Sequence, residues 1–419
     1  MKKSFLLLVL LIFAAIMVQA ATWYVSPVGT DDLLHGTSTG TGAFKTIQYA
    51  ITRAGSGDAI QIATGTYTAS NILVDKTLTI EGTGPTRDAV VVVPAAEDGN
   101  LNVTFDGTAQ NGFIIRAHNV VIRKLTIHGR GNNSLTAGKN NFRTGIVTLD
   151  PSQPGGNVWN NLHVDDVYIK YTYRRGISVF PKSVSGTVIE NSRIESVAYN
   201  QGMYLAGQSQ AVNNTVNHCF QGIVISVDET TPRELCRIKG NTLTQIGNFP
   251  GCFGDQGGGN YAFQPRAIEF DNSNHDGRNV EIINNIINDN GSAGIRGTVG
   301  IYTRLANAQS LVKNNTITLN SGASFSTGGS QAVGLLLGWS YDNGFSVSNN
   351  NLSCTGYGIG MLIFGSGTST RPMILEGNTL TSLAATRTDT ADGTGIYIAN
   401  QFLFAADNKY QSTVVVRNH

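Results

Sequence analysis

Ile282-Ile283-Asn284-Asn285-Ile286-Ile287 is the stretch of sequence that decides the fold. The pattern has six positions. In order they are an aliphatic residue, any residue, Asn or Gly, a residue that is usually Asn, any residue, and an aliphatic residue. Clear copies start at Ile238, Val312, Val347 and Leu375, and weaker copies start at Ile122, Val164, Ile189 and Ala211. A fixed motif that returns at uneven spacing indicates one coil per copy, with connecting loops of different length.

The alternation inside each copy predicts short strands that bury one face. The Asn or Gly falls where the chain must bend, because Asn tolerates the left-handed backbone region and hydrogen-bonds nearby backbone groups. Each copy pairs with a second kind of strand that starts with Gly-Ile, as at Gly176, Gly222 and Gly395. Stacked copies would place the Asn side chains in a ladder. We therefore predict a parallel solenoid.

The composition is that of a turn-rich β protein. The chain has 419 residues, of which 49 are Gly, and only 14% are charged. Asn, Thr, Ser, Ile and Val dominate the remainder, as strands and turns require. The net charge of +1 provides no strong attraction to nucleic acid or to an anionic membrane, so we expect neither as a partner.

Residues 1–20 are typical of a secretory signal peptide. Lys2 and Lys3 form the basic start, an apolar run follows over residues 5–18, and Ala20 ends a cleavage site of small residues. A membrane anchor is the alternative, but the run is short for a membrane span. We expect a secreted or cell-surface protein that is not inserted in a membrane after cleavage.

The four cysteines are Cys219, Cys236, Cys252 and Cys354, and their spacing fits no metal motif. Cys236 falls on an inward strand position, which predicts a small buried side chain. A disulfide between Cys236 and Cys252 is the alternative in an oxidising compartment.

The N-terminal region carries the clearest resemblance to known proteins. A short helix is expected where Phe44, Ile47, Ala50, Ile51 and Ala54 share one face. The run Phe44-Lys45-Thr46-Ile47-Gln48-Tyr49-Ala50-Ile51, with Gly57–Ile62 and Gly65–Tyr67 after it, resembles the N-terminal cap of secreted proteins with the pectin-lyase-like right-handed parallel β-helix. Such a helix covers the end of the hydrophobic core and its unpaired strands.

This resemblance extends over nearly the whole mature chain. It implies an all-β, right-handed parallel β-helix, with a first strand and capping helix in residues 21–67 and coils in residues 68–419. It does not imply one activity, because this fold hosts many functions. Val414–His419 looks like the opening half of another repeat. We expect either a monomer or a fragment of a longer surface protein, with a degenerate last strand as the alternative to a fragment.

Four long insertions interrupt the repeat at the same point of the coil. They span Gly129–Arg143, Gly247–Arg266, Asn320–Gln331 and Ser382–Asp392, always after the Asn-bearing strands and before the Gly-Ile strand. They are therefore expected to emerge from one corner. Insertions that collect on one side usually build the binding face of a solenoid.

The outward positions of the Gly-Ile strands are the first place to look for chemistry. By alternation they are Ser178, Tyr204, Val224, Glu269, Arg296, Leu336, Gly360 and Tyr397. Glu269 and Arg296 are expected side by side on neighbouring coils, with Asp271 on the same strand and Tyr204 two coils away. A surface ion pair of little energetic value is the alternative interpretation of Glu269 and Arg296.

The insertion before Glu269 adds side chains suited to a sugar ring. Apolar sugar faces stack on aromatic rings, while arginines and carboxylates bind hydroxyl or uronate groups. If the protein is an enzyme, the candidate catalytic residues are Glu269, Asp271, Arg296 and Arg266. The candidate substrate-binding residues are Tyr204, Tyr261, Phe263 and Asp255.

A second patch, Asp165-Asp166 with Lys170–Arg175 after it, raises the question of Ca²⁺. Paired carboxylates hold Ca²⁺, and a nearby Lys or Arg could abstract the proton beside a uronate carboxyl group. The resemblance to β-helix polysaccharide lyases makes that reading attractive. Asp166, however, falls on the bend position of the repeat, which favours a structural role. We predict no metal site, with Ca²⁺ kept as an open alternative.

Two functions remain at this point. The first is a non-catalytic or adhesive protein that binds polysaccharide on the face with the insertions. The second is a polysaccharide lyase or glycoside hydrolase that acts on acidic polysaccharide. Convergence of three or more of the candidate groups in one groove would favour the enzyme, and a flat wall of Ser, Thr and Asn would favour a binding or structural protein.

Overall fold

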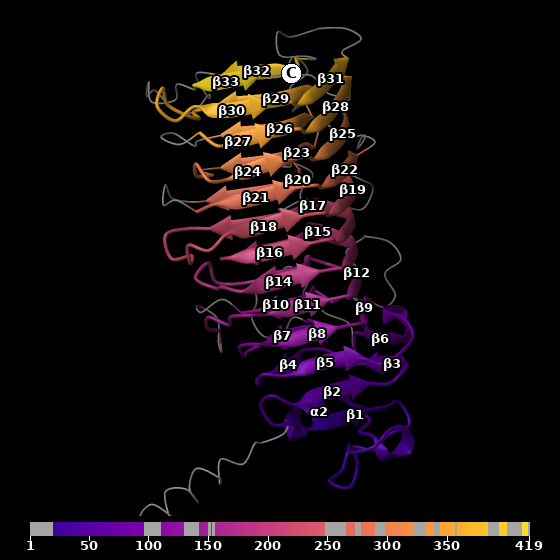
Figure 1. Ribbon diagram of the computed structural model, residues 1–419. Helices are drawn as coiled ribbons and strands as arrows, with labels where there is room; N and C mark the ends of the chain where they lie inside the picture. Colours follow the sequence, from indigo (N-terminus) through magenta and orange to yellow (C-terminus); the bar gives the residue numbers. More distant parts are fainter. Residues whose placement is uncertain are drawn as a thin grey trace, which may run out of the picture.

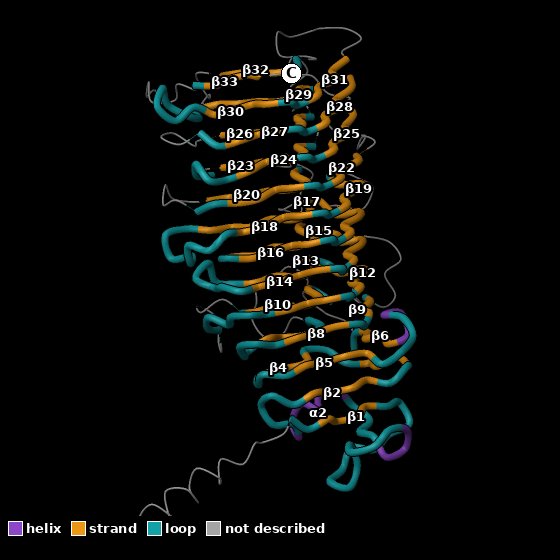
Figure 2. The backbone as a smooth tube through the Cα atoms, viewed as in Figure 1, coloured by secondary structure: helices purple, strands orange, loops and turns teal. Residues whose placement is uncertain are grey.

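The computed structural model describes residues 20–95, 110–129, 142–149, 152, 156–247, 265–272, 278–289, 298–304, 306–321, 332–338, 344–356, 358–383, 394–399 and 413–417. Within these ranges every strand pairing is parallel, and the chain winds into one cylinder of stacked coils (Figure 1). This confirms the predicted right-handed parallel β-helix. The strands form three flat walls joined by turns and loops (Figure 2).

The first wall contains the strands that open each Asn-bearing motif. Its strands are β1 (Thr22–Val25), β2 (Ala59–Ile62), β5 (Thr79–Gly82), β8 (Val121–Arg123), β11 (His163–Asp165), β14 (Thr187–Glu190), β16 (Ser209–Val212), β18 (Cys236–Lys239), β21 (Val280–Ile283), β24 (Leu311–Lys313), β27 (Ser346–Ser348), β30 (Met373–Glu376) and β33 (Val414–Arg417). The pairing of β33 with β30 shows that Val414–Arg417 continues the first wall.

The second wall contains the strands that follow the bend. They are β3 (Gly65–Thr68), β6 (Val90–Val93), β9 (Thr126–His128), β12 (Tyr168–Thr172), the first halves of β15 (Arg193–Ala206) and β17 (Thr215–Val227), β19 (Thr242–Ile246), β22 (Ile286–Asp289), β25 (Thr316–Ser321), β28 (Asn351–Gly356) and β31 (Thr379–Leu383).

The third wall contains the Gly-Ile strands. They are β4 (Ile72–Val74), β7 (Phe113–Ile115), β10 (Thr144–Thr148), β13 (Arg175–Val179), the second halves of β15 and β17, β20 (Arg266–Asn272), β23 (Val299–Arg304), β26 (Val333–Gly338), β29 (Ile359–Phe364) and β32 (Ile396–Ala399). The four insertions all leave the second wall and return to the third, as predicted. The insertions themselves lie mostly outside the described residues.

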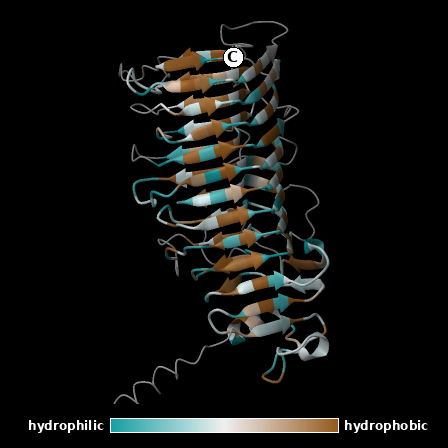
Figure 3. Ribbon diagram, in the orientation of Figure 1, coloured by the Kyte–Doolittle hydropathy of each residue, from teal (hydrophilic) through white to brown (hydrophobic). Residues whose placement is uncertain are grey.

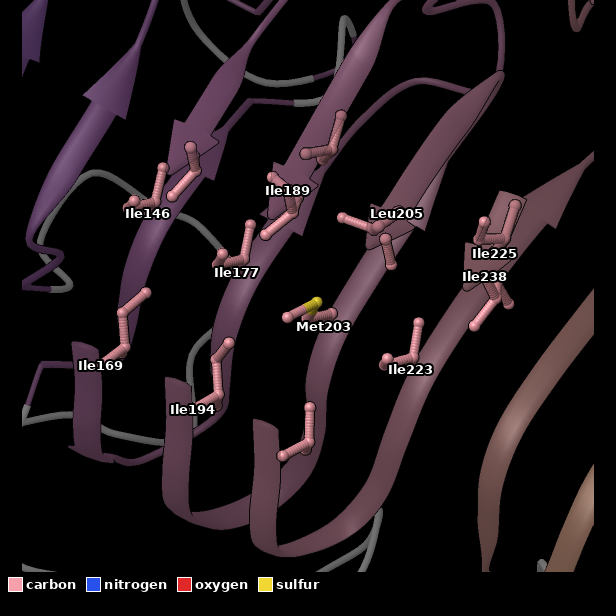
Figure 4. Packing of buried hydrophobic residues seen from close by; sticks show 14 of the residues in the cluster. Ile146, Ile169, Ile177, Ile189, Ile194, Met203, Leu205, Ile223, Ile225 and Ile238 are labelled. Atoms are coloured by element: carbon pink, nitrogen blue, oxygen red, sulfur yellow. The ribbon is translucent and has the colours of Figure 1, made fainter. Parts of the chain in front are cut away.

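One continuous hydrophobic core fills the cylinder. Aliphatic residues from equivalent positions of successive coils point inward and touch the residue one coil away (Figure 4, where Ile177, Met203 and Ile223 come from adjacent coils). Polar positions alternate with them along each strand (Figure 3). Neighbouring strands lie about 4.8 Å apart, so the apolar side chains of one coil pack directly on those of the next.

The two neighbouring Asn positions of the motif have different structural roles. The first position bends the chain: Asn284, Asn314 and Asn349 have φ values of 58°, 56° and 54°. The second position forms a buried ladder, in which each Asn side chain after that of Asn214 accepts a hydrogen bond from the main-chain N–H of the Asn one coil earlier. The members are Asn214, Asn241, Asn285, Asn315, Asn350 and Asn378. The predicted ladder is confirmed.

Close approach of the coils explains the glycines that begin the third-wall strands. A Cβ atom at Gly334 would lie 2.5 Å from the carbonyl oxygen of Gly360 on the next coil. The same obstruction recurs at Gly176, whose Cβ would meet the carbonyl oxygen of Gly202. Glycine is required there because no side chain fits.

The predicted capping helix is α2 (Ile47–Arg53). Thr46 caps its first turn by accepting a hydrogen bond from the Tyr49 N–H, and the Lys76 ammonium donates to carbonyl oxygens at its C-terminal end. All five predicted apolar residues of its face are buried against the first coils. Two short 3₁₀ turns, η1 (Gly40–Gly42) and η2 (Arg87–Ala89), complete the helical elements among the described residues.

Cys219, Cys236 and Cys354 are buried, Cys236 is a free thiol, and burial raises the pKa of the Cys236 thiol to about 11. The predicted burial of Cys236 is therefore confirmed, and the alternative of a disulfide with Cys252 is wrong. Cys252 lies outside the described residues. No helix in the described part of the chain is both long and apolar enough to span a membrane. The predicted signal peptide falls outside the described part, so it stays a prediction.

Candidate functional site

One row of outward side chains runs along the third wall. The strand register aligns Ser178, Tyr204, Val224, Glu269, Tyr302, Leu336, Leu362 and Tyr397. The sequence prediction of this row is wrong at two positions, where it gave Arg296 in place of Tyr302 and Gly360 in place of Leu362.

The two errors have one cause. Both coils contain two candidate starts for the strand, and alternation alone does not choose between them. Gly300-Ile301, not Gly294-Ile295, is in register with β20, so Tyr302 lies opposite Glu269. Arg296 lies outside the described residues. Gly360 belongs instead to the close-packed glycines, because its Cβ would lie 2.5 Å from the Gly395 carbonyl oxygen.

Glu269 points out of the cylinder and is nevertheless only 6% exposed. The Arg266 guanidinium, three residues earlier in β20, donates to one carboxylate oxygen. The Gln221 amide Nε2 donates to the other oxygen at 3.3 Å. A buried carboxylate requires partners of this kind. Glu269 thus pairs with Arg266, whose side chain is 22% exposed. The expected ion pair with Arg296 stays a prediction, because Arg296 lies outside the described residues.

Glu269 ends a line of hydrogen bonds that follows the cylinder axis. Arg175 Nε donates to Gln201 Oε1 at 2.7 Å, and Gln201 Nε2 donates to Gln221 Oε1 at 2.7 Å. Gln221 then donates to Glu269. A guanidinium only donates and a carboxylate only accepts, so the two ends fix the orientation of both amides. We call Arg175, Gln201, Gln221 and Glu269 the amide relay.

Tyr204 lies beside the start of the amide relay. The Arg175 guanidinium carbon is 4.7 Å from the centre of the Tyr204 ring and 5.6 Å from that of Phe180. The two ring centres are 5.0 Å apart. Burial raises the pKa of Tyr204, and a hydrogen bond with the Ser226 side chain opposes the rise. The phenol is therefore held neutral and fixed in place.

The other end of the site is more open to solvent. Arg304 Nε lies 2.6 Å from Asp271 Oδ1, and 37% of the Arg304 side chain is exposed. The Arg266 guanidinium carbon stacks 4.0 Å from the centre of the Tyr302 ring. Cation–π stacking and the ion pair together restrict Arg266 to one position over β20 and β23.

The two carboxylates of the site have different surroundings. Burial raises the pKa of Glu269, the charge on Arg266 opposes the rise, and the charge on Asp271 adds to it. Asp271, two residues further along β20, is more exposed and faces Arg304. Two carboxyl groups in unlike environments are an arrangement in which one group can act as acid and the other as base.

Further along the axis the outer face of the third wall becomes apolar. Val299, Tyr302, Val333, Ile359 and Leu362 form a buried cluster separate from the main core, with Leu336 packed against it. Tyr302 belongs to both regions, because it contacts this cluster and supports Arg266.

The structure thus brings Glu269, Arg266 and Asp271 together, and Tyr204 lies near them. Arg296, Tyr261, Phe263 and Asp255 lie outside the described residues, so their predicted roles stay predictions. The sequence analysis missed Arg175, Gln201, Gln221, Tyr302 and Arg304. The missed signal was a second outward row, which lies three residues before the row of Tyr204 and Glu269 on each strand. In that second row Gln201 is in register with Gln221 on the next coil.

The Asp165-Asp166 patch has a structural role. Asp166 is in the left-handed region with φ of 52°, as its place in the repeat predicted. Its carboxylate pairs with Arg87 at 3.2 Å, and Asp165 accepts a hydrogen bond from the Asn191 amide at 2.9 Å. Among the described residues, no group of His, Cys, Asp and Glu side chains is arranged to hold a metal ion.

No family model matches the chain, and no curated protein matches it by sequence. Several solved structures are similar in architecture. The A-module of mannuronan C-5 epimerase AlgE6 from Azotobacter vinelandii is 15% identical, with a TM-score of 0.45 over 85% of this chain and 94% of that one. Alginate lyase from Paenibacillus sp. str. FPU-7 is 16% identical, with a TM-score of 0.42 over 80% and 96%.

The catalytic unit of the GH87 α-1,3-glucanase from Streptomyces thermodiastaticus strain HF3-3 is 14% identical, with a TM-score of 0.49 over 96% of this chain and 68% of that one. The fold is a pectin-lyase-like β-helix. Three parallel walls, a ladder of Asn side chains and an N-terminal capping helix confirm the resemblance seen in the sequence.

Proposed function

We propose that this protein, secreted or displayed at the cell surface, binds an acidic polysaccharide along the outer face of the third wall. The observation that supports the proposal is the gathering of arginine, carboxylate and tyrosine side chains on adjacent coils of one wall. The group consists of Arg175, Arg266, Arg304, Glu269, Asp271 and Tyr204.

The arginines supply the affinity for a uronate group. A guanidinium carries five N–H donors, so Arg304 retains free donors while it pairs with Asp271. Arg304 is also the most exposed of the three arginines, which supports a contact with a bound chain. Arg266 and Arg304 lie on the paired strands β20 and β23, about 4.8 Å apart, so a glycan that lies along the axis would meet donors on two successive coils.

A second candidate function is cleavage of the same polysaccharide, by a lyase or a glycoside hydrolase. The unlike environments of Glu269 and Asp271 favour it. In a hydrolase the protonated Glu269 would donate to the leaving oxygen, and ionised Asp271 would serve as base or nucleophile. In a lyase, an ionised Glu269 or an arginine would act as base, and the remaining arginines would bind the uronate carboxyl group.

Binding is tested by calorimetric titration of the full chain with polygalacturonate and alginate, with neutral dextran for comparison. We expect binding of the polyuronides that weakens with salt, and a several-fold loss of affinity in Arg304→Gln. The matched control is Arg237→Gln, because Arg237 is also half-exposed and ion-paired, at 2.8 Å to Glu281, but lies on the first wall. Equal losses in both variants would refute this site.

Cleavage is tested by the release of reducing or unsaturated ends from the same polymers. An enzyme should lose that activity in Glu269→Gln and in Asp271→Asn. Binding that persists in the wild type with no new ends, with and without calcium, would leave the non-catalytic function in place. Activity that survives both substitutions would reject the catalytic assignment.

A further inference from the structure

From β17 to β31 the outer face of the second wall carries a regular array of uncharged side chains, whereas the preceding strands β12 and β15 carry Lys170, Arg193 and Glu195 on that face. In each of β17, β19, β22, β25, β28 and β31, two outward residues flank one inward aliphatic residue. We call the outward set the threonine face: Thr215, Asn217, Thr242, Thr244, Ile286, Asn288, Thr316, Thr318, Asn351, Ser353, Thr379 and Thr381. Seven of these residues are Thr, and none is charged or aromatic.

The threonine face is regular and open to solvent. Its strands pair in register from β17 to β31, with no shift along the row, and they form one column at the right-hand edge of the cylinder (Figure 1). All its members are exposed or half-exposed, and Ile286 is 50% exposed. The inward residues between them, such as Leu243, Ile317 and Leu352, are fully buried and hold the backbone rigid.

Charge complementarity limits what this face could bind. An acidic glycan, a nucleic acid or an anionic membrane requires cations, which the threonine face lacks. Recognition of sugar rings relies on aromatic stacking, and the face has no aromatic residue. The remaining chemistry is a neutral partner that is recognised by regularly spaced hydroxyl, amide and methyl groups.

The spacing of the array suits ordered water. O–H···O bonds of about 2.75 Å place waters that share a tetrahedral neighbour about 4.5 Å apart, with a perpendicular repeat of about 7.3 Å in the layered network. Neighbouring coils are about 4.8 Å apart, and residues i and i+2 of a strand about 6.7 Å apart. The spacings of the threonine face and those of the water network therefore differ by less than about a tenth in each direction.

We propose that the threonine face binds the surface of ice. Thr suits this task because its β-branched side chain has few rotamers and presents a methyl group beside a hydroxyl group. A rigid sheet loses little entropy when many such weak contacts form together. The face is on a different wall from the amide relay, so this proposal is independent of the proposed polysaccharide site.

The test is partition of the full chain into slowly growing ice, together with thermal hysteresis of its solution. We expect the wild type to enter the ice and to facet the crystals. Thr316→Tyr, in the middle of the face, should reduce hysteresis several-fold, because the large ring breaks the flat array while Tyr keeps a high strand propensity. The control is Thr370→Tyr, at an exposed Thr in the loop between β29 and β30.

A wild type that stays in the liquid as an unrelated serum protein does would overturn the proposal. Hysteresis that survives both Thr316→Tyr and Thr242→Tyr would also overturn it. Thr242 lies two coils away on the same face, so the second variant keeps the test valid if the first one fails to fold. A third outcome is adsorption to crystalline chitin or cellulose that Thr316→Tyr blocks, with no partition into ice. It would assign the face to a neutral glycan and would also overturn the ice proposal.

Discussion

Glu269 and Arg266 form a buried ion pair three residues apart on one strand, on the outside of a β-helix. Ion pairs on the other walls, such as Arg237 with Glu281, are much more exposed. Desolvation makes a buried pair sensitive to the loss of either partner. The predictions that follow start from this pair and then move to the supports of the fold.

The stability contribution of Glu269 should depend on pH. Burial raises its pKa above the ordinary value of 4.5 in the folded state. The folded protein therefore favours the protonated form, and this favourable term is lost as pH rises through the folded pKa. The amide introduced by Glu269→Gln does not ionise, so the melting temperature of the variant minus that of the wild type should rise between about pH 4 and about pH 7. A difference that falls over this range would mean that Arg266 stabilises the carboxylate more than burial penalises it.

Gln221 should support both stability and binding. Gln221→Leu keeps the volume roughly constant but leaves Gln201 and one Glu269 oxygen without their partner in the amide relay. Each orphaned buried group costs about 1–3 kcal/mol. We expect unfolding in urea at lower concentration and weaker polyuronide binding. Gln210→Leu is the control, because Gln210 is half-buried on the outside of the first wall, and its effect should stay within about 0.5 kcal/mol.

The Asn ladder should be the most sensitive polar feature of the core. Asn315 accepts hydrogen bonds from the main-chain and side-chain nitrogens of Asn285, both at 2.9 Å, and donates to the Ile282 carbonyl oxygen. Asn315→Ala should destabilise the fold by about 3 kcal/mol, since several buried groups lose partners. Asn351→Ala removes an exposed Asn and should change the unfolding free energy by less than about 0.5 kcal/mol. Similar values for the two would contradict the ladder's role.

The close approach of coils predicts a contrast between two glycines. Gly334→Ala would place a Cβ 2.5 Å from the Gly360 carbonyl oxygen, and its backbone cannot shift without moving the coil. Gly395 occupies the same column, and a Cβ there meets no atom of the described residues within 4 Å. Thermal melts should show a clear loss for Gly334→Ala, of about 1–3 kcal/mol, and a near-neutral effect for Gly395→Ala.

The sequence was sufficient to predict the parallel β-helix, because the bend and ladder positions repeat in one local motif. Asn284 bends the chain and Asn285 joins the ladder, and the two adjacent Asn residues can be recognised in the sequence. The capping helix was also predictable, since the apolar face of Ile47 and Ala50 is local. These features depend on residues close together in the chain.

The site was harder to predict, because its contacts join residues far apart in the chain. Tyr302 replaced Arg296 in the predicted row, since the length of a connection decides which Gly-Ile pair enters the strand. The roles of Gln201 and Gln221 were not predicted, because the hydrogen bonds of an amide depend on which residues lie one coil away. The burial of Glu269 was missed for the same reason: alternation gives a direction for a side chain and not its exposure.

Each rung of the Asn ladder joins one coil to the next through the same pair of groups, so the coils are interchangeable units. Deletion of residues 284–313 would join Ile283 to Asn314 and place Asn315 where the Asn241 N–H now finds Asn285. The gene can therefore gain or lose whole turns of the cylinder by in-frame duplication or excision without a mismatched junction. The length of the cylinder, and with it the reach of its outer surfaces, is open to evolutionary change in discrete steps.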